Sequence, residues 1–365
     1  MRGKEPVQES LYTVGNLRDF VAARMPADHP LHRIKAEADK VLASLDRDFD
    51  TLYSDRGRSS IPPERLLRAC LWQALFSVRS ERLLEDTLRF DLRCRWFVGL
   101  PLNEDAWDHS VFSKARDAFL LQTVAQLFFE RHLEFLRAEG LVSSEHLSVD
   151  GTLLAAWASP KSLVRRDELD KDGKPPKPPE GGRNGWVDFK GKKRSNETHV
   201  SASDPDARLA SKGNGTKLSH EMSVLAENRN NFAVGFTVMP PTGTSEREAA
   251  RALVAEQRDR GYKPTTVGGD KKYSDGDSLT EYLANECVEP HFAVRDDRPN
   301  ALARVFHNEP GYEISQRCRM RIEEIMSFVK TVCGLAKLKV RGVLRVFGAV
   351  AVAMGAYNLR RHAGF

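Results

Sequence analysis

The segment His146-Leu147-Ser148-Val149-Asp150-Gly151-Thr152 marks the clearest change of pattern in this chain of 365 residues. Leu147 and Val149 alternate with polar residues, which predicts a half-buried strand, because successive side chains on a strand face opposite sides. The strand ends at Asp150, directly before a glycine. Because ligand groups collect at strand ends in open α/β sheets, Asp150 is a candidate site residue.

A second strand with the same ending lies further along the chain, where Thr265-Thr266-Val267-Gly268-Gly269 precedes Asp270. The two glycines allow a close approach of backbone or ligand. Each aspartate taken alone is more often a turn residue. Together they suit a metal site, because two-metal phosphoryl transfer needs several converging carboxylates and Mg²⁺ prefers hard oxygen ligands.

The predicted elements around the two aspartates follow one order. After the strand ending at Asp150 come a polar stretch, a hairpin with strands over 217–225 and 232–239, a helix over 244–258, the strand ending at Asp270, a helix over 274–285, a strand over 290–294 and a long helix over 316–335. This α/β order predicts a mixed sheet with helices on its faces, compatible with a ribonuclease-H-like fold. The polar stretch is rich in Pro, Gly and charge, which predicts a flexible insertion without a core.

Residues 1–140 are predicted to be helical. Apolar residues recur at helical spacing after Pro62-Pro63-Glu64, and Ser80 and Ser110 are candidate caps of helices over 81–90 and from 110 towards 136. Two interpretations remain open for this part: a DNA-binding module similar to a helix-turn-helix, or a helical bundle that only packs or dimerises.

Composition narrows the class of protein. Hydrophobic residues make up 41% and charged residues 29%, as in ordinary soluble proteins, no run of about 18 apolar residues occurs, and the N-terminus has no signal-peptide core, so we expect a cytoplasmic protein without a membrane span. Five scattered cysteines form no Cys-x-x-Cys pair and no His-Glu-x-x-His occurs, which argues against a zinc site. Between positions 311 and 345, eight Lys or Arg stand against three Glu. Such a stretch is either a solvated face or a contact surface for nucleic acid.

Helix geometry selects one further acid in the long predicted helix. At about 100° per residue, Gln316, Arg319, Glu323 and Lys330 fall within about 60° of one another, whereas Glu324 projects roughly 100° away from Glu323. Glu323 is therefore the candidate third carboxylate. The alternative is a solvated stripe in which Arg319 and Glu323 form an i, i+4 ion pair.

Several segments resemble the bacterial insertion-sequence DDE transposases, in the large group that includes the fourth and fifth insertion-sequence families. The similar segments are Ser60-Ile61-Pro62-Pro63-Glu64, Ser77-Val78-Arg79-Ser80-Glu81-Arg82, Arg95-Trp96-Phe97-Val98-Gly99-Leu100, Trp107-Asp108-His109-Ser110-Val111-Phe112-Ser113-Lys114, residues 149–159 and Gly269-Asp270-Lys271-Lys272-Tyr273. The third block of the family, Tyr-x2-Arg-x3-Glu-x6-Lys, is matched by Arg319, Glu323 and Lys330, whereas Gln316 occupies the tyrosine position.

The resemblance implies a DNA transposase that cuts and joins phosphodiester bonds at the ends of an insertion sequence. Asp150, Asp270 and Glu323 would hold Mg²⁺, or alternatively Mn²⁺, to activate a water and later the freed 3′-hydroxyl and to stabilise the leaving oxygen. Arg319 and Lys330 would contact phosphates. The expected partners are double-stranded DNA of the element ends and target, and further copies of the chain in a homodimer or larger assembly.

The expected domains are a helical N-terminal domain over 1–140 for binding DNA ends or for dimerisation, a ribonuclease-H-like catalytic domain over 141–340 with the flexible insertion at about 160–216, and a C-terminal helical tail over 341–365. Two rival interpretations remain. One is a catalytically decayed transposase that only binds DNA, and the other is a related nuclease that hydrolyses without strand transfer.

Overall fold

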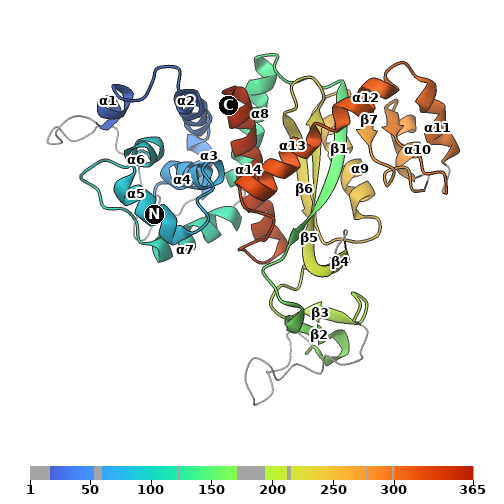
Figure 1. Ribbon diagram of the computed structural model, residues 1–365, viewed down its shortest axis with the longest axis horizontal. Helices are drawn as coiled ribbons and strands as arrows, with labels where there is room; N and C mark the ends of the chain where they lie inside the picture. The colour runs from blue at the N-terminus through green and yellow to red at the C-terminus, as the bar shows by residue number, and fades with distance from the viewer. Residues whose placement is uncertain are drawn as a thin grey trace. The chain divides into compact units, whose positions relative to one another are not determined.

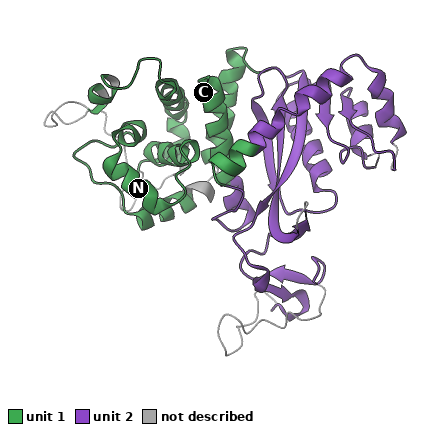
Figure 2. Cartoon of the chain, viewed as in Figure 1, with its two compact units in different colours: residues 1–142, 327–334, 348–365 green, residues 143–326, 335–347 purple. Residues whose placement is uncertain are grey.

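The computed structural model describes residues 17–52, 60–121, 124–170, 194–211, 215–276, 278–297 and 300–364. The chain divides into two compact units (Figure 2). One comprises residues 1–142, 327–334 and 348–365, and the other comprises residues 143–326 and 335–347.

The first unit is helical in its described parts (Figure 1). Its helices are α1 (Leu17–Ala22), α2 (Pro30–Ser44), α3 (Asp46–Leu52), α4 (Pro63–Leu75), α5 (Glu81–Phe90), α6 (Leu92–Val98), α7 (His109–Leu121) and α8 (Val124–Ala138), with the π-helical turn Phe328–Val332 and most of α14 (Val343–His362). The predicted cap of α5 is confirmed, since the Ser80 hydroxyl accepts the N–H of Leu83. The predicted start of α7 at Ser110 is wrong: the helix begins at His109, because the Asp108 carboxylate accepts the N–H of Ser110 at 2.8 Å.

The second unit is built on a mixed sheet (Figure 1). Its strands are β1 (His146–Ala155), β4 (Arg208–Ser211), β5 (Thr216–Glu227), β6 (Ala233–Met239), β7 (Thr266–Gly269) and β8 (Glu289–Phe292). They follow the order β4-β5-β1-β7-β8, and β6 pairs with β5. The neighbours β1, β7 and β8 run parallel, whereas β5 is antiparallel to β1, β4 and β6. The predicted hairpin is confirmed as β5 and β6, whose turn contains Asn231 in a left-handed conformation (φ 61°).

The helices of the second unit are α9 (Ser245–Asp259), α10 (Ser278–Asn285), α11 (Ala301–Val305), α12 (Tyr312–Arg319) and α13 (Ile322–Ser327). Gly151 of β1 faces α9, because a Cβ there would lie 3.0 Å from Glu246 Cγ. Gly268 of β7 faces α12, where the nearest helix atom is the carbonyl oxygen of Ser315. Gly268 is paired with Ser148, which alternates with Gly151 along β1, so α9 and α12 cover opposite faces of the sheet.

The long helix predicted over 316–335 is not continuous, which corrects that prediction. It is divided into α12, α13 and the π-helical turn Phe328–Val332, with a turn at Met320 and Arg321. The backbone N–H groups of Glu323 and Glu324 bond to carbonyls three residues earlier, and Asn231 of the hairpin turn donates to the carbonyl of Arg321 at 3.0 Å. A contact with the distant hairpin therefore coincides with the tightening of the chain at this point.

The predicted flexible insertion is described only in part. Residues 171–193 and 212–214, which include its Pro-rich run, lie outside the described residues. Its described parts contain a two-stranded sheet of β2 (Leu163–Arg165) and β3 (His199–Ser201). A small apolar cluster of Ala156, Leu163, Ala207 and Leu218 lies there too, so the expectation that this stretch has no core does not hold for its described ends.

Among the described helices, α14 is long and apolar enough to cross a membrane by length and composition alone, although the sequence shows no fully apolar run. Two-thirds of its apolar window, 67%, is buried inside the protein, as in the core helix of a globular domain.

Candidate active site

Asp150 lies in the middle of β1, because β1 pairs with β5 as far as Ala155, so the prediction that this strand ends at Asp150 is wrong. Asp270 directly follows β7, as predicted. The register of β1 with β7 pairs His146 with Thr266 and Ser148 with Gly268, a constant offset of 120 residues. Continuing that offset by two residues places Asp150 opposite Asp270, just after β7 ends. The ladder itself ends at the pair of Ser148 and Gly268.

The chain before Asp270 accepts only glycine at position 269. A Cβ on Gly269 would lie 2.8 Å from a ring atom of Phe292 and 2.9 Å from a ring atom of Tyr273. Both rings are fully buried, and their centroids are 5.8 Å apart. Two rigid aromatic rings therefore close on the strand end that carries Asp270.

The Tyr273 hydroxyl lies within electrostatic range of four carboxylates. Its ring is fully buried, and the hydroxyl has no hydrogen-bond partner among the residues that the structure describes. Burial raises the pKa of Tyr273 well above its ordinary value, and the charges of Asp150, Glu246, Asp270 and Glu221 raise it further. The hydroxyl therefore stays protonated and neutral.

Glu246 and Glu221 are acids that sequence patterns did not single out as site residues. Glu246 lies in the first turn of α9, where an acid is expected at any helix start, so its position carried no signal. Glu221 lies in β5 and is 5% exposed. The only feature of the sequence that could have pointed to Glu221 was its position inside a strand with few other charges, because carboxylates are rarely buried without a function or a partner.

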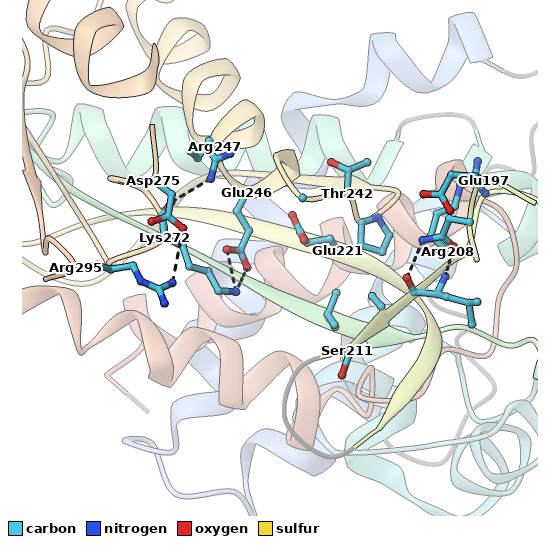
Figure 3. A pocket seen from close by; sticks show the side chains of 16 residues that line it. Glu197, Arg208, Ser211, Glu221, Thr242, Glu246, Arg247, Lys272, Asp275 and Arg295 are labelled. Atoms are coloured by element: carbon cyan, nitrogen blue, oxygen red, sulfur yellow. Dashed lines mark hydrogen bonds and ion pairs between the residues drawn. The ribbon is translucent and has the colours of Figure 1, made fainter. Parts of the chain in front are cut away.

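A cavity of about 560 Å³ opens beside these two acids (Figure 3). Its lining includes the glutamates, four cations and the apolar side chains of Leu153, Leu209 and Pro241; the cations are Arg208, Arg247, Lys272 and Arg295. Figure 3 shows Lys272 reaching Glu246, at 3.3 Å, and Arg295 reaching Asp275, at 3.8 Å. The cavity is thus lined by both signs of charge next to the strand ends.

Gln316 fastens α12 to the ends of β7 and β8. Its side-chain amide donates to the carbonyl oxygens of His291, at 2.6 Å, and Gly269, at 3.3 Å. Its carbonyl oxygen accepts from Arg319 Nε at 3.4 Å. A tyrosine hydroxyl, with one donor, could not make both donor contacts. The glutamine at the tyrosine position of the family block therefore has a structural role next to Asp270.

The acids of the third block point to different surroundings. Glu324 Oε2 accepts from Asn231 Nδ2 at 3.2 Å, which directs it towards the hairpin turn. Glu323 is exposed on α13. In the described part of the chain, Glu323 belongs to no group of three acidic, His or Cys side chains whose ligand atoms lie within 4.8 Å of one another. Asp150 and Asp270 belong to no such group in the described residues either.

The two expected phosphate contacts lie in different units. Arg319 is half-buried at the end of α12 in the second unit, and Lys330 is half-buried in the π-helical turn, which belongs to the first unit. A π-turn shifts the direction of later side chains relative to an α-helix, so the single stripe predicted for these residues does not extend to Lys330.

Two groups in the described residues bring acid and histidine ligand atoms within 4.8 Å: Glu37, Glu139 and His362, and Glu85, Asp108 and His109. Other groups already occupy their acids. Glu139 accepts from Lys40 at 2.7 Å, and Glu85 accepts the backbone N–H of His109 at 3.0 Å. Beside the first group, the ammonium of Lys40 therefore lies where a metal ion would bind.

Two family models match the chain: "Transposase domain (DUF772)" over residues 19–118 and "Transposase DDE domain" over residues 198–359. Together they span well over half of the sequence. A solved structure, the cryo-EM structure of a piggyBac transposase synaptic complex with hairpin DNA, is similar with 9% identity and a TM-score of 0.38, over 93% of this chain and 76% of that chain. Similarity at that level assigns neither fold nor function. No curated protein matches this sequence.

The two family matches define a protein of the DNA transposase class, with a helical part and a mixed α/β part. The chain belongs to the insertion-sequence DDE transposases.

Proposed function

We propose that this transposase cuts and rejoins the ends of its insertion sequence through a metal-dependent site formed by Asp150, Asp270 and Glu323. The observation that carries the proposal is the register of β1 with β7, whose offset of 120 residues, continued beyond Gly268, would bring Asp150 opposite Asp270. Support for Glu323 comes from the spacing of the third family block.

The order of the strands supports a ribonuclease-H-like catalytic domain. A three-stranded antiparallel part, β6-β5-β1, is extended by the parallel strands β7 and β8, with helices on both faces. In this arrangement β1 lies at the centre of the sheet, and its neighbour β7 is short. The proposed site would lie at the point where β7 ends beside β1.

The carboxylates suit Mg²⁺ or Mn²⁺, which prefer hard oxygen ligands, and the buried Tyr273 hydroxyl supplies a neutral donor beside them. When bound, the ions would activate the attacking oxygen and stabilise the leaving one. Asp150 would hold them from β1 and Asp270 from the residue directly after β7, and Gln316 would keep α12 against the ends of β7 and β8.

Arg319 and Lys330 would contact phosphates of double-stranded DNA, Arg with a planar fork and Lys as a point charge. The helical part at 1–140 would bind DNA ends or mediate dimerisation, and residues 341–365 would complete the fold as a helical tail. Two element ends must be joined to one target, so we expect a homodimer or larger assembly on DNA in the cytoplasm.

Asp150→Asn tests the proposal directly. The change is nearly isosteric but removes the charge of a proposed metal ligand, so the variant should fold and bind end-bearing DNA while Mg²⁺-dependent cleavage and strand transfer both collapse. Cleavage, joining and binding are measured at matched salt. Equal cleavage by both proteins would refute the assignment. Binding without cleavage by the wild type would favour the decayed, DNA-binding alternative, and cleavage without joining would favour a nuclease.

A further inference from the structure

Three potential metal ligands from distant parts of the chain meet inside the first unit. Glu37 lies on α2, Glu139 directly follows α8, and His362 is the last residue of α14. Their ligand atoms lie within 4.8 Å of one another. His362 Nε2 is 3.2 Å from Glu139 Oε2, close to the separation of about 3.4 Å between two ligands of one tetrahedral ion with bonds of about 2.1 Å. The group therefore has the spacing of a metal ligand set.

Two buried atoms of this group make no hydrogen bond. Glu37 Oε2 and His362 Nδ1 are 3.9 Å apart, and neither has a hydrogen-bond partner among the residues that the structure describes. Buried polar atoms are nearly always bonded, and an ordered water or an ion is a common partner where the protein itself supplies none. The group therefore retains capacity to bind a ligand.

A second histidine, His132, points to this group from α8. It precedes Glu139 by seven residues, about two helical turns, so both project from one face of the helix. Its ring is fully buried, and neither ring nitrogen has a hydrogen-bond partner in the described part of the chain. Its centroid is 5.8 Å from that of His362, and two imidazoles on one tetrahedral ion lie about 5 Å apart. Burial, helped by the charges of His362 and Lys40, lowers the pKa of His132 to about 3, so the ring is neutral, as a metal ligand must be.

Lys40 places a positive charge between the two acids. Its ammonium is 2.7 Å from Glu139 Oε1 and 3.6 Å from Glu37 Oε2. The side chain is 43% exposed and has a flexible four-carbon stem, so the ammonium can turn into solvent. The lysine therefore marks where the acids hold a cation, and it can leave that position to a cation with more ligands.

We propose that these two glutamates and two histidines bind a divalent transition-metal ion, best Zn²⁺, in exchange for the ammonium of Lys40. Imidazole favours Zn²⁺ over Mg²⁺, which prefers oxygen ligands, so this ion differs from the one expected at Asp150. The first unit consists of segments from both ends of the chain, and α14 returns to it after the second unit. A bound ion would join the end of α14 to α2 and α8, and would thereby hold these segments together.

The test measures Zn²⁺ binding to the full chain by isothermal titration calorimetry, and Tm with and without Zn²⁺. The wild type should bind Zn²⁺ and melt at a higher temperature in its presence, because an ion that binds only the folded chain stabilises it. His362→Gln and Glu139→Gln should each weaken binding by more than about 100-fold, beyond the 10–100-fold typical of groups that only support a ligand. Lys40→Met should strengthen binding by up to about fivefold, the value of an exposed ion pair that the metal no longer has to break.

Glu85→Gln is the matched control, because Glu85 belongs to the other acid–histidine group of the same unit, and this variant should bind Zn²⁺ like the wild type. Asp150→Asn should also keep this binding, which separates the site from the proposed active site. Unchanged binding in His362→Gln would overturn the proposal, as would weaker binding in Lys40→Met or an equal loss in Glu85→Gln. If Asp150→Asn cleaved DNA normally, the proposed function would fail while the zinc result would stand.

Discussion

Gly269→Ala should destabilise the second unit and displace Asp270. The added Cβ would lie 2.8 Å from Phe292 and 2.9 Å from Tyr273, closer than real Cβ atoms come to a neighbour. Both contacts are ring atoms of fully buried side chains, so neither ring can turn away into solvent. Overpacking of this kind costs about 1–3 kcal/mol, which lowers Tm by roughly 2–12 °C for a unit of this size. A displacement of Asp270 by about 1 Å would reduce cleavage about 100-fold.

Gly268→Ala is the matched control one residue earlier. Its Cβ would meet Ser148 Oγ at 3.5 Å and Ser315 O at 3.6 Å, which are ordinary contacts, so the free energy of unfolding should change by less than about 1 kcal/mol. Differential scanning calorimetry and Mg²⁺-dependent cleavage measure the two effects. If Gly269→Ala melted and cleaved like Gly268→Ala, the argument from ring contacts at the strand end would be wrong.

Three further results are expected. Glu323→Gln should reduce cleavage by more than the 10–100-fold typical of groups that only support a metal ligand, whereas Glu324→Gln keeps its contact with Asn231 and should cleave normally; equal activities would remove Glu323 from the site. Tyr273→Phe should leave the free energy of unfolding unchanged or raise it by up to about 1–3 kcal/mol, and a loss in urea melts would show that the hydroxyl has a structural partner. Burial lowers the pKa of His132 to about 3. Between about pH 3 and pH 6.5 the unfolded chain therefore binds one proton more at this residue than the folded chain does. His132 therefore favours the fold above about pH 6.5 and loses up to about 1.4 kcal/mol per pH unit below it, a slope that His132→Phe should remove from melts taken between pH 4 and 7.

The alternation around Val149 and the glycines before Asp270 were enough to predict a strand at each aspartate. Only Asp270 directly follows its strand, whereas Asp150 lies within β1, which continues to pair with β5 as far as Ala155. The asparagines between two apolar runs likewise predicted the β5–β6 hairpin, because Asn tolerates left-handed turn geometry. These features depend on neighbours within a few residues, so the sequence carries them directly. The offset of 120 residues between β1 and β7 could not be predicted from the sequence, because it is defined only by the pairing of the two strands.

The tertiary structure decided what each local element meets. A helical period of 100° per residue predicted one stripe from Gln316 to Lys330, but a turn at Arg321, bonded to Asn231, and a π-turn interrupt it. Helical period fixes relative direction only while the helix continues, and contacts from distant segments decide where it stops. The amide of Gln316 bonds to two strand-end carbonyls for the same reason: residue type supplies a donor and an acceptor, and only the assembled sheet determines their partners.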